Sequence, residues 1–241
     1  MDVVIYTHRD AHWCLPPFAY LFTRYWSGMQ AVYVAGGEPD VELPPNFHWL
    51  EVESRVKERW SDGLIDALNI LTADIVCLFL EDYWLCRYVA WDLIGSLEQY
   101  MLEHKDVLKI DLTADRLHSG RAVDVEPYGR ADIIETDWQT SYNYSLQLGL
   151  WNRKHLLGCL HPEMSPWDFE LQDKPREDLR VLATRNFPCR YLNAVGMQLD
   201  AKYRYRIEHI REGLGGKTIE RIAPEHVQRM LELGILPPQE K

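Results

Sequence analysis

Long hydrophobic runs are absent from this 241-residue sequence. The longest apolar stretch, Ile75–Leu80, lies between Asp74 and Glu81, whereas a membrane-spanning helix needs about 18 to 20 apolar residues. The amino-terminal stretch Met1–Tyr6 also lacks the basic region and the long apolar core of a secretion signal. We therefore expect no stable membrane insertion and a cytoplasmic location.

Cysteine pairs and the usual glycine-rich cofactor signatures are also missing. The five cysteines are an odd number without a C-x-x-C pair, which predicts neither a disulfide framework nor structural zinc. No G-x-G-x-x-G, Walker or G-x-S-x-G motif occurs, so dinucleotide-binding, P-loop and hydrolase interpretations lack their usual support. His8 and His12 are four residues apart, but they flank an expected loop, which does not favour a histidine metal site.

The sequence has fewer basic than acidic residues: 26 Lys and Arg against 37 Asp and Glu, with a formal net charge of −11. This balance disfavours a general affinity for nucleic acid, which depends on Lys and Arg. One basic stretch, Lys202–Arg221, stands out, although glutamates dilute it. It is either an ordinary solvated face or a surface for the phosphates of a donor or of an anionic acceptor.

The residues that are present predict one α/β domain, because 46% of the sequence is hydrophobic and can bury a large core. β-rich runs alternate with runs that have the 3.6-residue spacing of amphipathic helices. The alternation predicts a Rossmann-like, mostly parallel central sheet flanked by helices. The expected strands are Val3–Tyr6, Ala31–Ala35, Phe47–Val52, Ile75–Leu80 and Val107–Leu112, and the expected helices are Phe18–Trp26, a helix capped by Ser61, and Trp91–Glu103.

The alternation is interrupted after Leu112. Residues 113–141 are rich in polar and turn residues, so we expect a long irregular segment, which is either an acceptor-binding loop or a connector without a chemical role. Beyond it, Tyr144–Leu150 alternates as a strand does, and Trp151–Leu160 has the pattern of a helix.

Two acids end the central hydrophobic strand. Glu81 and Asp82 directly follow Leu80, and ligands of open α/β sheets bind outside the carboxyl ends of the strands. A carboxylate at that place can hold a divalent metal, and the metal can hold a diphosphate. The alternative is a solvated turn after a core strand. We favour an enzyme that uses a nucleotide sugar.

A second acidic motif, Ser165–Glu170, has the pattern of a helix start. Ser165 fits the N-cap, and Asp168 lies where an acid offsets the orphan amides and the helix dipole. Glu170 lies beyond the capping positions and beside Phe169. An acid in such a place can act as general base toward an acceptor hydroxyl. Glu170 is the first candidate for the base and Asp168 the second.

Together these motifs resemble those of glycosyltransferases with the A-type fold, a family found in bacterial polysaccharide loci and in phage genomes. The resemblance covers most of the chain. It is carried by Tyr6–Thr7, by Trp60–Asp62 at a helix start, by Leu80–Leu85, by Tyr144–Trp151, by Ser165–Glu170 and by Gly215–Lys217 before an amphipathic terminal helix.

The resemblance implies a transferase that binds Mn²⁺ or Mg²⁺ through an Asp-x-Asp-type motif. The matching positions are Glu81 and Asp82, but Tyr83 stands where the motif has its last acid. Asp82 is then the expected metal ligand, because Mg²⁺ often takes one or two carboxylates plus substrate phosphates. The alternative is a metal-independent enzyme in which a basic residue neutralises the leaving diphosphate. The candidates for that role are Arg9, Arg204 and Lys217.

The expected reaction is direct, inverting transfer of a hexosyl or pentosyl group from a UDP-linked sugar to an acceptor hydroxyl. The acceptor is a glycan intermediate or, for a phage protein, a hydroxymethylpyrimidine in DNA. Besides Glu81 and Asp82, further residues are candidates for the donor site because they lie near predicted strand ends and helix starts. Thr7, Arg9 and Asp10 are expected at the nucleoside, and Trp60 and Asp62 at the base or sugar.

We expect residues 1–241 to form a single domain with two functional halves. Residues 1–112 would bind the nucleotide sugar, residues 113–222 would carry the acceptor and catalytic groups, and residues 223–241 would form a terminal helix and tail. Two other functions fit the same fold: nucleotidyl transfer to a sugar phosphate, and carbohydrate binding without catalysis. The oligomeric state is left open.

Overall fold

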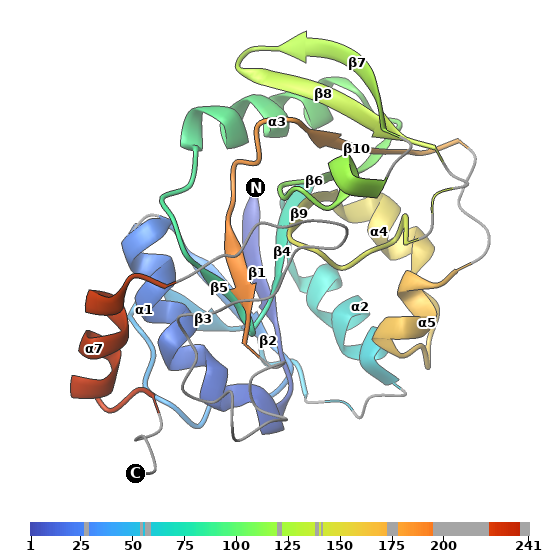
Figure 1. Cartoon of the computed structure of the whole chain (residues 1–241). Coiled ribbons are helices and arrows are strands. Elements are labelled where there is room, and N and C mark those ends of the chain that lie inside the picture. Colours follow the sequence, from blue (N-terminus) through green and yellow to red (C-terminus); the bar gives the residue numbers. More distant parts are fainter. Residues whose placement is uncertain are drawn as a thin grey trace.

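A nine-stranded sheet forms the centre of the protein (Figure 1). The computed structural model describes residues 1–26, 29–53, 55, 59–119, 122–137, 140, 142–172, 178–194 and 222–236. The strand order is β3-β2-β1-β4-β9-β6-β10-β8-β7. The strands are β1 (Asp2–Tyr6), β2 (Val32–Ala35), β3 (Phe47–Trp49), β4 (Ile75–Leu80), β6 (Val107–Asp111), β7 (Ala122–Tyr128), β8 (Ala131–Thr136), β9 (Gly149–Asn152) and β10 (Arg180–Thr184).

The sheet is mixed but mostly parallel. Strands β3, β2, β1 and β4 are parallel neighbours, and β6 is parallel to β10. Strand β9 lies antiparallel between β4 and β6, and β8 is antiparallel to both β10 and β7. Within the nine-stranded sheet, β8 and β9 thus run antiparallel to the other described strands. This arrangement confirms the predicted α/β class with a mostly parallel central sheet.

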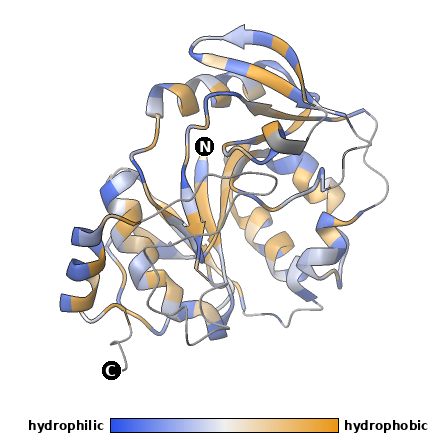
Figure 2. Cartoon of the chain, viewed as in Figure 1, coloured by the Kyte–Doolittle hydropathy of each residue, from blue (hydrophilic) through white to orange (hydrophobic). Residues whose placement is uncertain are grey.

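Helices cover both faces of the sheet (Figure 1). Side chains of a strand alternate between its faces, so Ile5 of β1 belongs to the hydrophobic cluster that includes residues of α1, α3 and α7, while Val4 belongs to the cluster with residues of α2, α4 and α5. The central strands are hydrophobic because both faces are buried (Figure 2). The helices are α1 (Leu15–Tyr25), α2 (Trp60–Ile70), α3 (Trp91–Glu103), α4 (Arg153–Cys159), α5 (Pro166–Glu170) and α7 (Pro224–Glu232), with 3₁₀ helices η1 (Arg9–Cys14) and η3 (Arg116–Ser119).

The strand order reverses at β1. Strand β2 pairs with one edge of β1 and β4 pairs with the other, and the connecting helices α1 and α2 lie on opposite faces. Such a switch point opens a crevice at the carboxyl ends of the two strands. Thr7, which follows β1, and Glu81, which follows β4, therefore lie at this crevice.

The prediction of an irregular segment over residues 113–141 was wrong. This region contains η3 and a hairpin of β7 and β8 at the edge of the sheet. The turn at Gly129 has a φ of +58°, which glycine adopts without strain. The polar composition has another cause: β7 is an edge strand with several exposed positions, and edge strands carry polar residues. Figure 2 shows the mixed hydropathy of this hairpin.

The expected strand at Tyr144–Leu150 was also wrong for most of its length, because β9 begins at Gly149 and the following helix begins at Arg153. Tyr144, Leu146 and Leu148 are nevertheless buried. The apolar alternation thus came from a non-repetitive segment packed on the core. Alternating apolar and polar residues indicate that one side of a segment is buried, but the segment need not be a strand.

The helix expected to be capped by Ser61 begins two residues earlier, at Trp60. Arg59 is the N-cap of α2, and the Ser61 hydroxyl instead donates to the carbonyl of His161 at 2.7 Å. A small second sheet was not predicted: β5 (Tyr83–Leu85) pairs antiparallel with β11 (Tyr191–Asn193). In the part of the chain that the structure describes, no helix is long and apolar enough to cross a membrane.

Candidate active site

The acid pair Glu81 and Asp82 forms the turn between β4 and β5. Both side chains are buried, with 6% and 5% of their surface exposed. Burial and, second, the neighbouring Asp82 together raise the pKa of Glu81 to about 8, while a hydrogen bond from Thr7 acts against the shift. The pair is therefore a desolvated, strongly coupled acid site that binds a proton near neutral pH.

Thr7 is the first residue beyond β1, and the structure brings it to the acid pair; its predicted contact with a nucleoside stays a prediction. Its backbone N–H donates to the carbonyl of Ala35 at 2.9 Å, and its side chain hydrogen-bonds Glu81. Gly36 makes room for this loop, because a Cβ at Gly36 would lie 1.8 Å from the Thr7 carbonyl oxygen. Thr7 thus joins the ends of β1, β2 and β4 at the switch point.

The 3₁₀ helix η1 follows Thr7 and carries Arg9 and Asp10, whose side chains are exposed. At its end, burial raises the pKa of the Cys14 thiol, and Glu81 and Asp82 raise it further. Electrostatic influence of this kind requires proximity, so Cys14 at the end of η1 lies near the acid pair. Arg9 and Asp10 are consequently on the loop that borders the crevice, and their predicted contact with a nucleoside stays a prediction.

Trp60 and Asp62 begin α2, near the end of β1. The Tyr6 hydroxyl donates to the Trp60 carbonyl at 2.8 Å, and the rings of Tyr6 and Trp60 meet edge to face at 5.6 Å. The pKa of Asp62 is lowered, first by the N–H of Glu163 and also by Arg59. Both groups bond the Asp62 carboxylate, at 2.9 and 2.6 Å. In this structure Asp62 therefore anchors the chain before α5, and its predicted contact with the base or sugar stays a prediction.

Helix α5 carries both candidate bases, Asp168 and Glu170, and their hydrogen bonds differ. Ser165 and Asp168 form a reciprocal capping box, and these bonds lower the pKa of the exposed Asp168. The predicted capping role of Asp168 is thereby confirmed. Phe169 is fully buried and contacts Trp60, with ring centroids 5.9 Å apart. This contact fixes α5 against α2 and aims the next residue, Glu170, toward the sheet.

Glu170 is half-buried, and its Oε1 accepts a hydrogen bond of 2.6 Å from the backbone N–H of Leu146. Burial raises its pKa, while the Leu146 N–H and the Lys109 ammonium act in the opposite direction. A raised pKa makes the ionised carboxylate a stronger proton acceptor. Glu170 thus has the character of a general base, whereas Asp168 is occupied by its cap.

Two tyrosines lie between the acid pair and Glu170. The rings of Tyr83 and Tyr191 are 4.4 Å apart, and strands β5 and β11 hold them side by side. Burial raises the pKa of both hydroxyls, and Asp82 and Glu170 contribute to both shifts. Both acidic centres therefore act electrostatically on the same aromatic pair.

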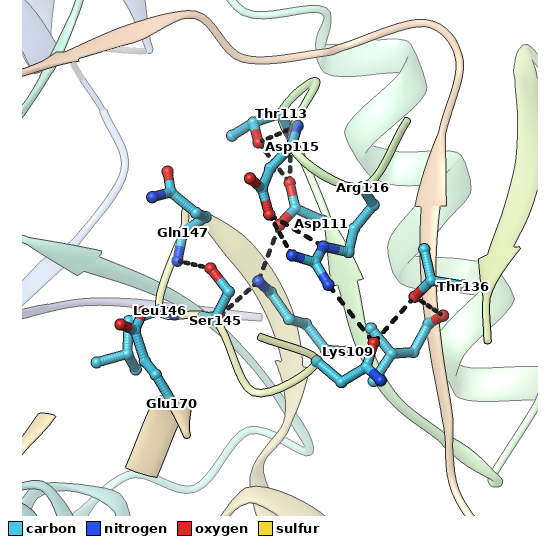
Figure 3. A network of polar contacts seen from close by, with 12 residues as sticks. Lys109, Asp111, Thr113, Asp115, Arg116, Thr136, Ser145, Leu146, Gln147 and Glu170 are labelled. Carbon is cyan, nitrogen blue, oxygen red and sulfur yellow. Dashed lines mark hydrogen bonds and ion pairs between the residues drawn. The ribbon is translucent and has the colours of Figure 1, made fainter. Parts of the chain in front are cut away.

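A buried polar network at the carboxyl end of β6 borders this site (Figure 3). Lys109 forms an ion pair with Asp111 at 2.9 Å, and both side chains have no more than 1% of their surface exposed. Arg116 pairs with Asp115 at 2.6 Å and donates to Oδ1 of Asn143 at 3.4 Å. The network ties β6 and η3 to the segment before β9.

Our sequence reasoning missed Lys109, Asp111 and Tyr191. A signal for the first two was present, because Lys109 and Asp111 point to one face of an otherwise apolar strand. Buried charges in a core strand must be paired. Tyr191 carried no comparable signal. The basic stretch Lys202–Arg221, including Arg204 and Lys217, lies outside the described residues.

No protein-family model matches the sequence, and no curated protein is similar to it at a significant level. Similar solved structures include TarS 1–349 from S. aureus, with 14% identity and a TM-score of 0.46 over 86% of this chain. A cytidylyltransferase from Leptospira borgpetersenii serovar Hardjo-bovis has 9% identity and a TM-score of 0.45, covering 100% of this chain and 98% of its own. The bifunctional IspDF from Campylobacter jejuni has 10% identity and a TM-score of 0.34 over 74% of this chain.

The chain spans 66% of the length of TarS 1–349 and 45% of that of IspDF. The TM-scores of these three matches are all below 0.5. The likeness concerns the arrangement of helices and strands and assigns no activity. The function is therefore argued from the residues of this chain.

Proposed function

We propose that this protein is a glycosyltransferase that moves a sugar from a nucleoside diphosphate sugar to an acceptor hydroxyl. The observation that carries the proposal is the buried acid pair, Glu81 and Asp82, at the switch point of the sheet. Two desolvated carboxylates side by side are unfavourable unless a ligand compensates them. Their position outside the carboxyl end of β4 is where α/β sheets bind phosphorylated ligands.

The donor set of the acid pair fits a divalent cation such as Mn²⁺ or Mg²⁺. Both carboxylates supply the oxygen ligands that these ions prefer, and a cation bound between them would take the place of the proton that Glu81 holds near neutral pH. The described residues contain no group of three or more acidic, His or Cys side chains that could enclose a metal. Asp82, with Glu81, would therefore share the ion with substrate phosphates. When bound, the ion supplies charge neutralisation for a leaving diphosphate.

Glu170 is the proposed base. Because Oε1 accepts the N–H of Leu146, Oε2 is the oxygen proposed to take the proton of the acceptor hydroxyl. The hydroxyl oxygen then bonds to the anomeric carbon as the bond between that carbon and the diphosphate oxygen breaks, which inverts the configuration. Asp168 is less suited, because its carboxylate is bonded in the capping box and its pKa is lowered.

The remaining donor contacts are proposed from position. Thr7, Arg9 and Asp10 border the crevice next to the acid pair, as a nucleoside site requires. Trp60 and Asp62 lie in the first turn of α2. We keep UDP as the first nucleotide to test. The acceptor is a glycan intermediate or a hydroxymethylpyrimidine in DNA.

Nucleotidyl transfer to a sugar phosphate is the second candidate, because the same acid pair would serve it equally well. The two reactions differ in their need for Glu170. An acceptor hydroxyl must lose its proton, whereas the phosphate of a sugar phosphate is already ionised and needs no base. A protein without catalysis would bind a sugar ligand and give no turnover in either assay.

The deciding experiment is calorimetric titration of UDP and GDP with and without Mn²⁺, followed by turnover assays. One assay offers UDP-sugars with hydroxyl acceptors, and the other offers nucleoside triphosphates with sugar phosphates. Metal-dependent binding that is lost in Asp82→Asn, with turnover in the first assay alone, supports glycosyl transfer. Turnover in the second assay alone contradicts it. Binding unaffected by Asp82→Asn contradicts the metal assignment.

A further inference from the structure

Lys109 is a fully buried cation in the middle of the sheet. Its ammonium donates to Oδ2 of Asp111 at 2.9 Å and to the backbone carbonyl of Ser145 at 2.8 Å. It also lies over the ring of Trp151, 5.0 Å from the centroid, which is a favourable position for a cation. The charge is therefore satisfied on each side, as a buried ammonium must be.

Neighbouring strand β9 is shaped to admit the Lys109 side chain. A Cβ at Gly149 would lie 2.6 Å from Cε of Lys109 and 3.0 Å from the carbonyl of Ile110. Any larger residue would displace the lysine stem or the strand. The chain thus leaves a specific space for a lysine where an apolar residue would fill the core more simply.

Asp111 completes this arrangement on the other side. Its Oδ1 accepts the backbone N–H and the hydroxyl of Thr113, at 2.8 and 2.6 Å. The carboxylate is therefore held in one orientation at the end of β6, and it directs the Lys109 ammonium toward Ser145. Figure 3 shows the ammonium between Asp111 and Ser145.

The segment Ser145–Gln147 connects this ion pair to both acidic centres. Its Leu146 N–H donates to Oε1 of Glu170 at 2.6 Å. The Leu146 carbonyl accepts the Tyr83 hydroxyl at 3.2 Å, and Tyr83 directly follows Asp82. The segment is non-repetitive, so no ladder of sheet hydrogen bonds sets its position. The Lys109 ammonium is the charged donor that holds it.

We propose that Lys109 is a positioning residue: through the Ser145 carbonyl it holds the segment Ser145–Gln147, which in turn aims Glu170 and fixes its distance from the acid pair. The value of this role for catalysis rests on the proposed function of Glu170 as base. The role itself is a property of the folded chain, and it can be tested without substrate.

The pKa of Glu170 is a second quantity that tests the proposal, because it depends on the charges around this carboxyl. Among the charged groups that act on Glu170, the Lys109 ammonium lowers its pKa most, followed by Asp115, which raises it, and Arg116, which lowers it. Tyr83 and Tyr191 also face this carboxyl. Removal of the Lys109 charge should therefore raise the pKa of Glu170.

The test compares the wild-type protein with the double variant Lys109→Met/Asp111→Asn, which removes the ion pair without leaving one buried charge unpaired. The matched control is Arg180→Gln/Glu135→Gln, which removes a bidentate ion pair between β10 and β8 in the same sheet. Two quantities are measured by NMR on the full chain: hydrogen exchange of the Leu146 amide, and the pH titration of the Glu170 carboxyl carbon, identified with Glu170→Gln.

We expect the Leu146 amide to exchange at least about tenfold faster in the double variant, with amides of β4 unchanged, and the pKa of Glu170 to rise. The control should leave both quantities at wild-type values. Wild-type behaviour of either quantity in the double variant would overturn the proposal. If that variant does not fold, Lys109→Gln is measured in the same way, and the same results decide. Failure of the proposed function would appear separately, as absent donor binding in the wild-type protein.

Discussion

The most direct test of the acid pair is its effect on stability. Burial and the charge of Asp82 raise the pKa of Glu81 from its ordinary value of 4.5 to about 8 in the folded protein. Below pH 4.5 the side chain is protonated in both the folded and the unfolded chain. Between pH 4.5 and 8 the unfolded chain binds fewer protons than the folded one, so the free energy of unfolding falls as the pH rises.

The size of the effect follows from the two pKa values. With 4.5 in the unfolded and about 8 in the folded chain, ionisable Glu81 lowers the free energy of unfolding by about 1 kcal/mol at pH 5 and about 3 kcal/mol at pH 7. Glu81→Gln removes this dependence while keeping the shape of the side chain. The variant should therefore be more stable than the wild type, and its advantage should grow by about 2 kcal/mol from pH 5 to pH 7.

Urea unfolding at the two pH values measures the difference directly. Glu53→Gln, at an exposed position, is the matched control for loss of a carboxylate. In an Asp82→Asn background the advantage of Glu81→Gln should shrink, because Asp82 contributes to the raised pKa. An equal advantage at pH 5 and pH 7 would refute the reasoning, since it would mean that Glu81 is not desolvated in the folded protein.

Four further substitutions test the rest of the site. Asp82→Asn should abolish metal-dependent donor binding and leave the circular dichroism spectrum unchanged. Donor binding that persists in this variant would contradict the assignment of Asp82 as a metal ligand. Glu170→Gln should reduce turnover by about 100-fold or more with donor affinity nearly unchanged. Asp168→Asn should weaken the capping box, which thermal unfolding would detect as a lower melting temperature, and change turnover little. The reverse ranking would make Asp168 the base. Gly63→Ala should destabilise the fold by about 1 to 3 kcal/mol, because its Cβ would lie 2.2 Å from the Tyr6 hydroxyl, and in the Tyr6→Phe background much of that loss should disappear.

Some of this site could be predicted because the signals are local. A strand buried on both faces must be apolar, so the run Ile75–Leu80 marks β4, and the two acids after it mark the carboxyl end. The capping box is local as well, because Ser165 and Asp168 are three residues apart. These features depend on neighbours in the sequence, and the structure agrees with them.

Other features depend on partners that are far apart in the chain. Ser61 has the residue type of an N-cap, but the chain near His161 uses its hydroxyl 100 residues away. Arg59 therefore occupies the cap position. The hairpin of β7 and β8 was missed because an edge strand has the polar composition of a loop.

By itself, the sequence determined the α/β class, the position of β4 and its terminal acids, and the start of α5, because hydrophobic periodicity and capping chemistry act over a few residues. Only the tertiary structure decided that Glu170 faces the sheet through Leu146, that Tyr191 stands beside Tyr83, and that Lys109 reaches Ser145. These contacts join segments 24 to 108 residues apart. Their geometry is set by the packing of the whole sheet, and residue spacing along the chain does not encode it in a readable form.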